Sequence, residues 1–229
     1  MRAPSVTALP TLSAHNSDRG SVLLCALMVI ALIGTLGAAL ALVVSTESAV
    51  AGNYVASQQG LYAAEAGVER AIGEIRLLPT WGALPAPSST TPSADFNDGQ
   101  AMPRGPDGSM LNLAQLTIQR QAESDAMRPA APDRPVWRLY AHAPFGRMVA
   151  ASGTAAPYVV VWLADDPDDL DGDPAVDTND VVLVHAEAFG VRAGRRAIDV
   201  TIQREEAMAA GFPGVMRSDV HVIAWHEGR

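Results

Sequence analysis

The residues with the clearest potential for chemistry are eight aspartates within 16 consecutive positions, with no basic residue among them. They are Asp165, Asp166, Asp168, Asp169, Asp171, Asp173, Asp177 and Asp180. Alternate carboxylates around a glycine turn can direct several oxygens at one point, which is what a hard cation such as Ca²⁺ requires. The pattern therefore predicts a candidate calcium site. The first candidate ligands are Asp169, Asp171 and Asp173, and the next are Asp177 and Asp180.

A solvated acidic turn between two strands is the alternative reading of this stretch. Its spacing does not fit the EF-hand loop, in which a glycine follows the third ligand and a glutamate closes the loop. Asp-Gly and Asp-Pro pairs are also ordinary turn chemistry. On the other side, eight like charges in one loop repel one another unless they are screened or bound. The sequence leaves both readings open.

Charge and motif content exclude several classes of function. The net charge of −9 comes almost entirely from the acidic stretch, and an acidic balance argues against nucleic acid as a partner. The sequence has no nucleophile elbow, phosphate loop or dinucleotide fingerprint. Its single cysteine excludes an intrachain disulfide and a Cys-rich metal cluster. We interpret His185 and Glu187 as ordinary sheet residues, because no third ligand stands at a known spacing. We therefore do not expect an enzyme, nor any cofactor other than calcium.

A membrane-spanning helix is predicted near the N-terminus, over residues 21–46. Residues 20–46 carry no charge, and as a helix they would extend roughly 40 Å, more than the ~30 Å hydrocarbon core of a bilayer. A secretory signal peptide is the alternative, but its apolar core is usually only ~7–15 residues long. Arg2 and Arg19 precede the segment and Glu47 follows it, which predicts a cytoplasmic N-terminus.

The helix is expected to continue beyond the membrane, over residues 47–78. No proline occurs between Ala49 and Leu78, and apolar or aromatic residues recur every seven positions at Tyr54, Leu61, Val68 and Ile75. Such a stripe is typical of an amphipathic helix that packs on a domain of its own chain. Pro79 should end it, so we expect one helix over Ser21–Leu78.

Residues 18–76 resemble the N-terminal part of a known protein family. The junction Asp18-Arg19-Gly20-Ser21 before the apolar helix resembles a type IV prepilin leader. Two further segments resemble the N-terminal domain of PilX-type minor pilins, with Gly52, Asn53 and Tyr54 in the first and Ala64, Glu65 and Gly67 in the second. The resemblance implies a leader over residues 1–20, which a prepilin peptidase removes after Gly20 before it methylates the new N-terminus at Ser21.

The resemblance also implies a role and a location. It implies a minor subunit of type IV pilus assembly, held by one span in the bacterial inner membrane, with a periplasmic C-terminal domain. Its partners would be the prepilin peptidase, other pilins and the pilus assembly platform, and it could end in the extracellular pilus. Major pilins have a glutamate at the fifth mature position, where this chain has Cys25, which favours a minor subunit over a bulk one. A GspK-like pseudopilin of type II secretion and a membrane-anchored periplasmic binding module are the alternatives.

The rest of the chain divides into a proline-rich segment and a β-rich domain. Residues 79–135 contain nine of the 16 prolines and are read as a loop or linker, in which 111–118 could be a strand or a short helix. Residues 136–229 should form an antiparallel sheet with one solvated face, because apolar and polar residues alternate over 197–203. A hairpin is expected at 190–194. Packed on the long helix, this sheet gives an α+β, pilin-like fold. The expected strands are Val136–Ala143, Tyr158–Leu163, Val181–Phe189, Ala197–Gln203 and Val220–Trp225.

Overall fold

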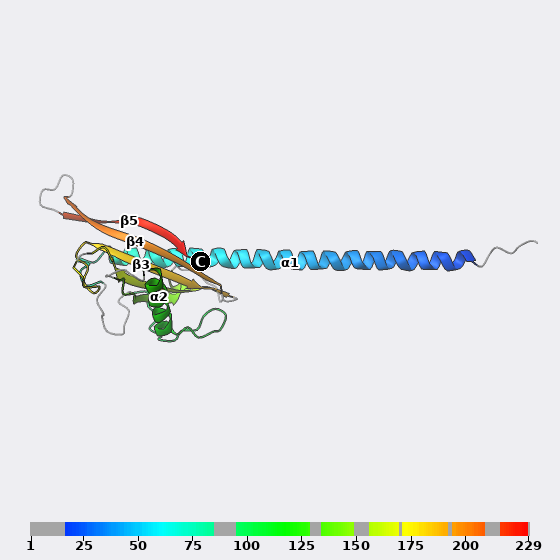
Figure 1. Cartoon of the computed structure of the whole chain (residues 1–229), viewed down its shortest axis with the longest axis horizontal. Helices are drawn as coiled ribbons and strands as arrows, with labels where there is room; N and C mark the ends of the chain where they lie inside the picture. Colours follow the sequence, from blue (N-terminus) through cyan, green and yellow to red (C-terminus); the bar gives the residue numbers. More distant parts are fainter. Residues whose placement is uncertain are drawn as a thin grey trace, which may run out of the picture. The chain divides into compact units, whose positions relative to one another are not determined.

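The computed structural model describes residues 17–84, 95–128, 134–148, 156–169, 171–191, 194–208 and 216–228. The fold is α+β, with a long N-terminal helix and a five-stranded antiparallel sheet (Figure 1). Most of the expected leader, 1–16, lies outside the described residues. The chain divides into two compact units, residues 1–52 and 53–229. The elements are α1 (Ser17–Ile75), α2 (Leu113–Met127), β1 (Arg138–Pro144), α3 (Phe145–Met148), β2 (Tyr158–Asp165), β3 (Val181–Phe189), β4 (Arg195–Met208) and β5 (Met216–Gly228).

The first unit contains the apolar part of α1. From Gly20 to Gly52 every residue of the helix is exposed, including large side chains such as Leu23, Ile30 and Leu40 at about two thirds of their full accessibility. By length and composition this helix can cross a membrane. A continuous apolar surface of this kind marks a contact with lipid or with another apolar surface. The prediction of a helix with the properties of a membrane span is confirmed.

The end of α1 falls three residues earlier than expected. The helix ends at Ile75, because the N–H groups of Leu77 and Leu78 bond to carbonyls only three residues back, at 3.1 and 3.0 Å. Such tightening is a common way to satisfy the last carbonyls of a helix. The indole N–H of Trp81 also donates to the carbonyl oxygen of Ile75 at 3.2 Å. A turn therefore separates the helix from Pro79.

The second half of α1 supplies one side of the main core. Its buried hydrophobic residues are Ala63, Ala64, Val68, Ala71, Ile72 and Ile75. They pack against alternate residues of β2, β3 and β4, among them Val159, Val184 and Val200. The expected apolar stripe is therefore buried at Val68 and Ile75 and partly buried at Leu61, whereas Tyr54 at its start is 66% exposed.

Gly67 sets how closely α1 approaches the sheet. A methyl group at this position would lie 2.6 Å from Cγ1 of Val159 and 3.5 Å from Cγ2 of Val161. Contacts shorter than about 3 Å between carbon atoms are strongly repulsive, so only glycine fits without movement. The glycine thus has a packing role that its position in the sequence motif did not reveal.

The five strands form a meander in the order β1-β2-β3-β4-β5, with every neighbouring pair antiparallel. All five expected strands are present. β3 has the expected bounds, and β4 and β5, with 14 and 13 residues, are about twice as long as expected. The expected hairpin joins β3 to β4, where the N–H of Gly190 donates to the carbonyl of Gly194 at 2.7 Å; residues 192 and 193 lie outside the described part.

The expectation of one solvated sheet face is wrong for β2, although β4 does alternate. All eight residues of β2 are buried, because a second core of aromatic and aliphatic residues covers its other face. This core consists of Leu111, Leu113, Trp137, Tyr158, Val160, Trp162, Ala164 and Phe189. The continuous apolar run of β2 is what burial on both faces requires.

The reading of 79–135 as a loop or linker is also wrong in part. The segment contains α2, whose start is capped by Asn112, with the side-chain oxygen accepting from the N–H of Gln115 at 3.1 Å. Residues 111–118, for which the sequence left a strand and a short helix open, therefore contain the start of a helix. Trp81 and Phe96 lie in the main core, so this segment belongs to the globular unit; 85–94 and 129–133 lie outside the described residues.

We expect Gly67→Ala to destabilise the protein by about 1–3 kcal/mol, the usual cost of overpacking a tight core. Gly73→Ala is the matched control, because this glycine is also in α1 but has nothing within 4 Å of an added methyl. Alanine there should be neutral or stabilising by up to about 1 kcal/mol. Urea unfolding of the full chain in detergent micelles, followed by tryptophan fluorescence, measures both. Equal effects of the two substitutions would contradict the close approach at Gly67.

Candidate functional site

The acidic stretch forms the connection between β2 and β3. Several of its carboxylates accept a hydrogen bond from the backbone N–H two residues later. These bonds give a series of local turns, which is the usual chemistry of aspartate in loops. The donors are the N–H groups of Asp168, Asp171, Asp173, Ala175 and Asn179.

Asp169 links two separate parts of the loop by hydrogen bonds. Its two carboxylate oxygens accept hydrogen bonds from the hydroxyl of Thr178 at 2.6 Å and from the N–H of Thr178 at 2.7 Å, nine residues along the chain. Burial alone would raise the pKa of Asp169, but these bonds, with those from the N–H groups of Asp171 and Asn179, lower it. Asp169 is therefore an ionised carboxylate held at a fixed place.

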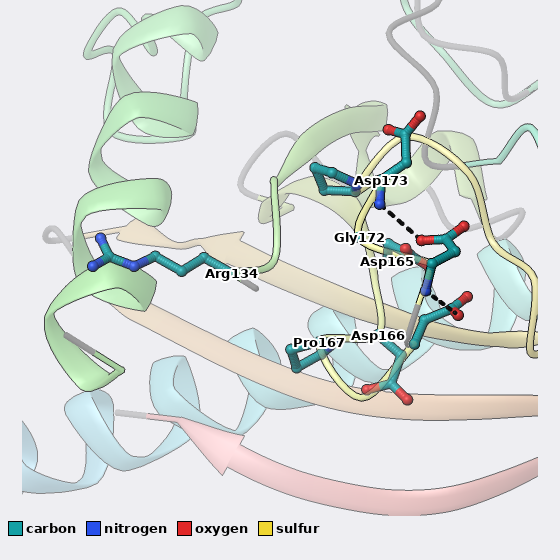
Figure 2. Close-up of a pocket in the computed structure, with 9 residues that line it drawn as sticks. Arg134, Asp165, Asp166, Pro167, Gly172 and Asp173 are labelled. Atoms are coloured by element: carbon teal, nitrogen blue, oxygen red, sulfur yellow. Dashed lines mark hydrogen bonds between the residues drawn. The ribbon is translucent and has the colours of Figure 1, made fainter. Parts of the chain in front are cut away.

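Three carboxylates of the stretch converge. One oxygen each from Asp165, Asp169 and Asp171 lies within 4.8 Å of the other two. They line a pocket of about 160 Å³ together with Asp166 and Asp173 and with Arg134, Pro167, Gly172 and Pro174. Figure 2 shows the guanidinium of Arg134 extending away from the carboxylates, so its positive charge does not lie among them.

Asp165 is the unusual member of this cluster. It lies at the end of β2 and is only 4% exposed, and no donor within the described part of the chain bonds to its Oδ1. Burial raises the pKa of Asp165 to about 7, and the negative charges of Asp177, Asp169 and Asp171 add to this. A buried carboxylate with an oxygen that lacks a partner is costly unless a proton or a cation neutralises it.

The structure selects a different set of residues from the one that the sequence favoured. Asp169 and Asp171 belong to the cluster, but Asp173, Asp177 and Asp180 do not. The Oδ1 of Asp173 accepts from the N–H of Ala175 at 3.0 Å, and Asp177 accepts from the N–H of Val181 at 3.3 Å. Burial, followed by the charge of Asp180, raises the pKa of Asp177 to about 6.

Asp165 was not among the ligands that the sequence favoured, although it belongs to the acidic stretch. Its position was nevertheless a signal. A carboxylate that closes a fully buried strand must itself be close to the interior. The strand Tyr158–Asp165 ends with Ala164 buried in the second core and Asp165 buried beside the acidic loop.

The residues of the pilin-like motifs fall into two groups along α1. Gly20, Ser21 and Cys25 are exposed in the first unit, as is Gly52. Of the remaining motif residues, Asn53, Tyr54 and Glu65 are exposed, whereas Ala64 and Gly67 are buried against the sheet. The motif therefore combines two packing positions with a row of exposed ones.

Charged residues on the α2 side of the sheet pair with one another. Asp199 accepts hydrogen bonds from Arg120 at 2.7 Å and from the ring of His185 at 2.8 Å. Glu187 forms an ion pair with Arg195. These contacts agree with the interpretation of His185 and Glu187 as ordinary sheet residues.

Comparison with protein-family models, with curated proteins and with solved structures gives no match. A long apolar N-terminal helix whose second half packs on an antiparallel sheet is compatible with a pilin-like fold. The helix is also consistent with a single-pass membrane anchor.

Asp180 has a backbone role in the loop. Its φ of 57° lies in the left-handed region, and its carbonyl oxygen accepts a hydrogen bond from the N–H of Arg204 at 2.9 Å. Asparagine tolerates this conformation well, so Asp180→Asn should leave stability unchanged or slightly raised, since it removes a charge near Asp177. Asp180→Val should cost about 1–2 kcal/mol, because a branched side chain is strained there. Thermal unfolding of the two variants makes the comparison, and equal melting temperatures would contradict a backbone role.

Proposed function

We propose that this protein is a minor pilin-like subunit of type IV pilus assembly, with no catalysis of its own. The observation that carries the proposal is that one helix, α1, has two different halves. Its first half is apolar and exposed on all sides, and its second half supplies one side of the core of the globular unit. A subunit that waits in a membrane and then joins a filament needs both kinds of surface on one element.

The mechanism of such a subunit is assembly. A prepilin peptidase would cut after Gly20, remove 20 of the 229 residues and methylate the new N-terminus at Ser21. The subunit would then stay in the bacterial inner membrane through the apolar half of α1, with its N-terminus in the cytoplasm. When the assembly platform extracts it, the same apolar side chains would leave lipid and pack against the helices of other pilins. Both environments are apolar, so the helix exchanges one for the other at little hydrophobic cost.

Small residues on the apolar half support helix-to-helix packing. Gly34 and Gly37 lie on the exposed part of α1, and neither would have a neighbour within 4 Å of an added methyl. Glycine and alanine allow two helices to approach closely where no hydrophobic effect drives them together. Cys25 stands at the position where major pilins have a glutamate, which supports a minor subunit that initiates or caps a filament.

Processing after Gly20 is tested in cells that produce an active prepilin peptidase. The wild-type chain should be recovered from the membrane with Ser21 as its N-terminal residue, and Gly20→Val should keep its leader, because a branched side chain hinders the approach of the protease to the backbone. Gly37→Val is the matched control, since it adds the same side chain to another exposed glycine of α1 and should be processed normally. An intact Met1 on the wild-type chain would refute the proposed processing.

The same variant separates assembly from simple anchoring. If α1 is only a tether for a periplasmic binding module, Gly20→Val should leave the display of the globular unit at the membrane and its function unaffected. If the protein assembles, loss of processing should be accompanied by loss of pili. A GspK-like role in type II secretion predicts loss of secretion in place of loss of pili, and the two readouts are measured in the same strain.

A further inference from the structure

We propose that Asp165, Asp169 and Asp171 bind a hard divalent cation, with Ca²⁺ preferred over Mg²⁺. The decisive residue is Asp165, whose carboxylate is buried at 4% exposure and has an Oδ1 that no donor in the described residues reaches. That carboxylate faces the two others within 4.8 Å, so its missing partner is a positive charge at the point where the three meet.

The chemistry of the ligands specifies the kind of cation. All three are carboxylates, and the other polar side chains of the pocket, apart from Arg134, are the carboxylates of Asp166 and Asp173. A site with only oxygen ligands and several negative charges favours a hard cation, whereas zinc and copper prefer nitrogen or sulfur. The pocket of about 160 Å³ also has room for water molecules that would complete the coordination.

Calcium makes fewer geometric demands on these ligands than magnesium does. Two oxygens on the same ion can be at most about 5.2 Å apart for calcium and about 4.2 Å apart for magnesium, which is twice the usual metal–oxygen distance. Oxygens within 4.8 Å of one another therefore fit around calcium, while magnesium accepts only the shorter part of that range. Calcium also tolerates irregular geometry, which suits ligands from a strand end and a loop.

Two of the ligands are already held in place. Asp169 accepts from Thr178, and Asp171 accepts from the N–H of Asp173 at 2.8 Å, the bond marked by the dashed line that starts at the labelled Asp173 in Figure 2. Each carboxylate oxygen has two lone pairs, so an oxygen that accepts a hydrogen bond can still coordinate an ion. The cation would therefore connect the end of β2 to a preformed loop. It would stabilise the connection between β2 and β3. This site does not depend on the processing of α1.

Calcium binding to the full chain in detergent micelles tests the proposal, after chelator treatment and at constant ionic strength. We expect calcium at roughly 1 mM, the range of extracellular modules, to raise the melting temperature of the wild type and to bind with measurable heat. Asp165→Asn and Asp169→Asn should each weaken calcium affinity about tenfold or more. Asp168→Asn is the matched control, because it removes the same charge from an exposed position of the same loop outside the cluster.

Asp165→Asn gives a second readout that a folding defect cannot imitate. Without calcium this variant should melt at or above the wild-type temperature, because it removes a buried charge, and with calcium it should melt below it. The proposal is overturned if calcium leaves the wild-type melting temperature unchanged, or if Asp168→Asn loses as much affinity as Asp165→Asn, which would indicate only screening of the acidic loop. Equal binding of magnesium and calcium would overturn the assignment of the ion.

Discussion

The contact between α1 and β2 is the constraint on which the globular unit depends. Gly67 leaves no room for a methyl group beside Val159, and the neighbouring core positions on the helix are mainly alanine and valine. This close approach seals one face of β2, while α2 and the residues before it seal the other. A strand covered on both faces carries its end into the interior, and that end is Asp165.

The electrostatics of the acidic loop follow from that burial. Asp165 and Asp169 are four residues apart, both are buried, and their pKa values move in opposite directions. Donors from Thr178 stabilise the charge of Asp169, whereas Asp165 loses its hydration without gaining equivalent donors. The loop therefore combines fixed negative charge with one buried carboxylate whose charge is not compensated by a donor at Oδ1, and the proposed cation would supply that compensation.

In contrast to the buried charge of the loop, the exposed half of α1 presents apolar side chains that are not buried. Its apolar side chains from Gly20 to Gly52 have no partner among the described residues, which is unfavourable in water for a surface of this size. Lipid would cover these side chains in a membrane, and the helices of other subunits would cover them in the proposed filament. The two halves of the helix thus have different surfaces, although both belong to the single helix Ser17–Ile75.

The sequence by itself determined the long helix, the antiparallel strands and the α+β class, because the period of apolar residues and the positions of proline and glycine are local signals. It also located the acidic loop. It did not determine which carboxylates meet, since Asp165 joins Asp169 and Asp171 only when β2 is buried and the loop folds back on its end. Nor did it reveal α2 as the cover of the second sheet face, although Asn112 was a usable cap signal. Convergence of side chains and burial of a charge depend on packing between distant segments, and only the tertiary structure decides them.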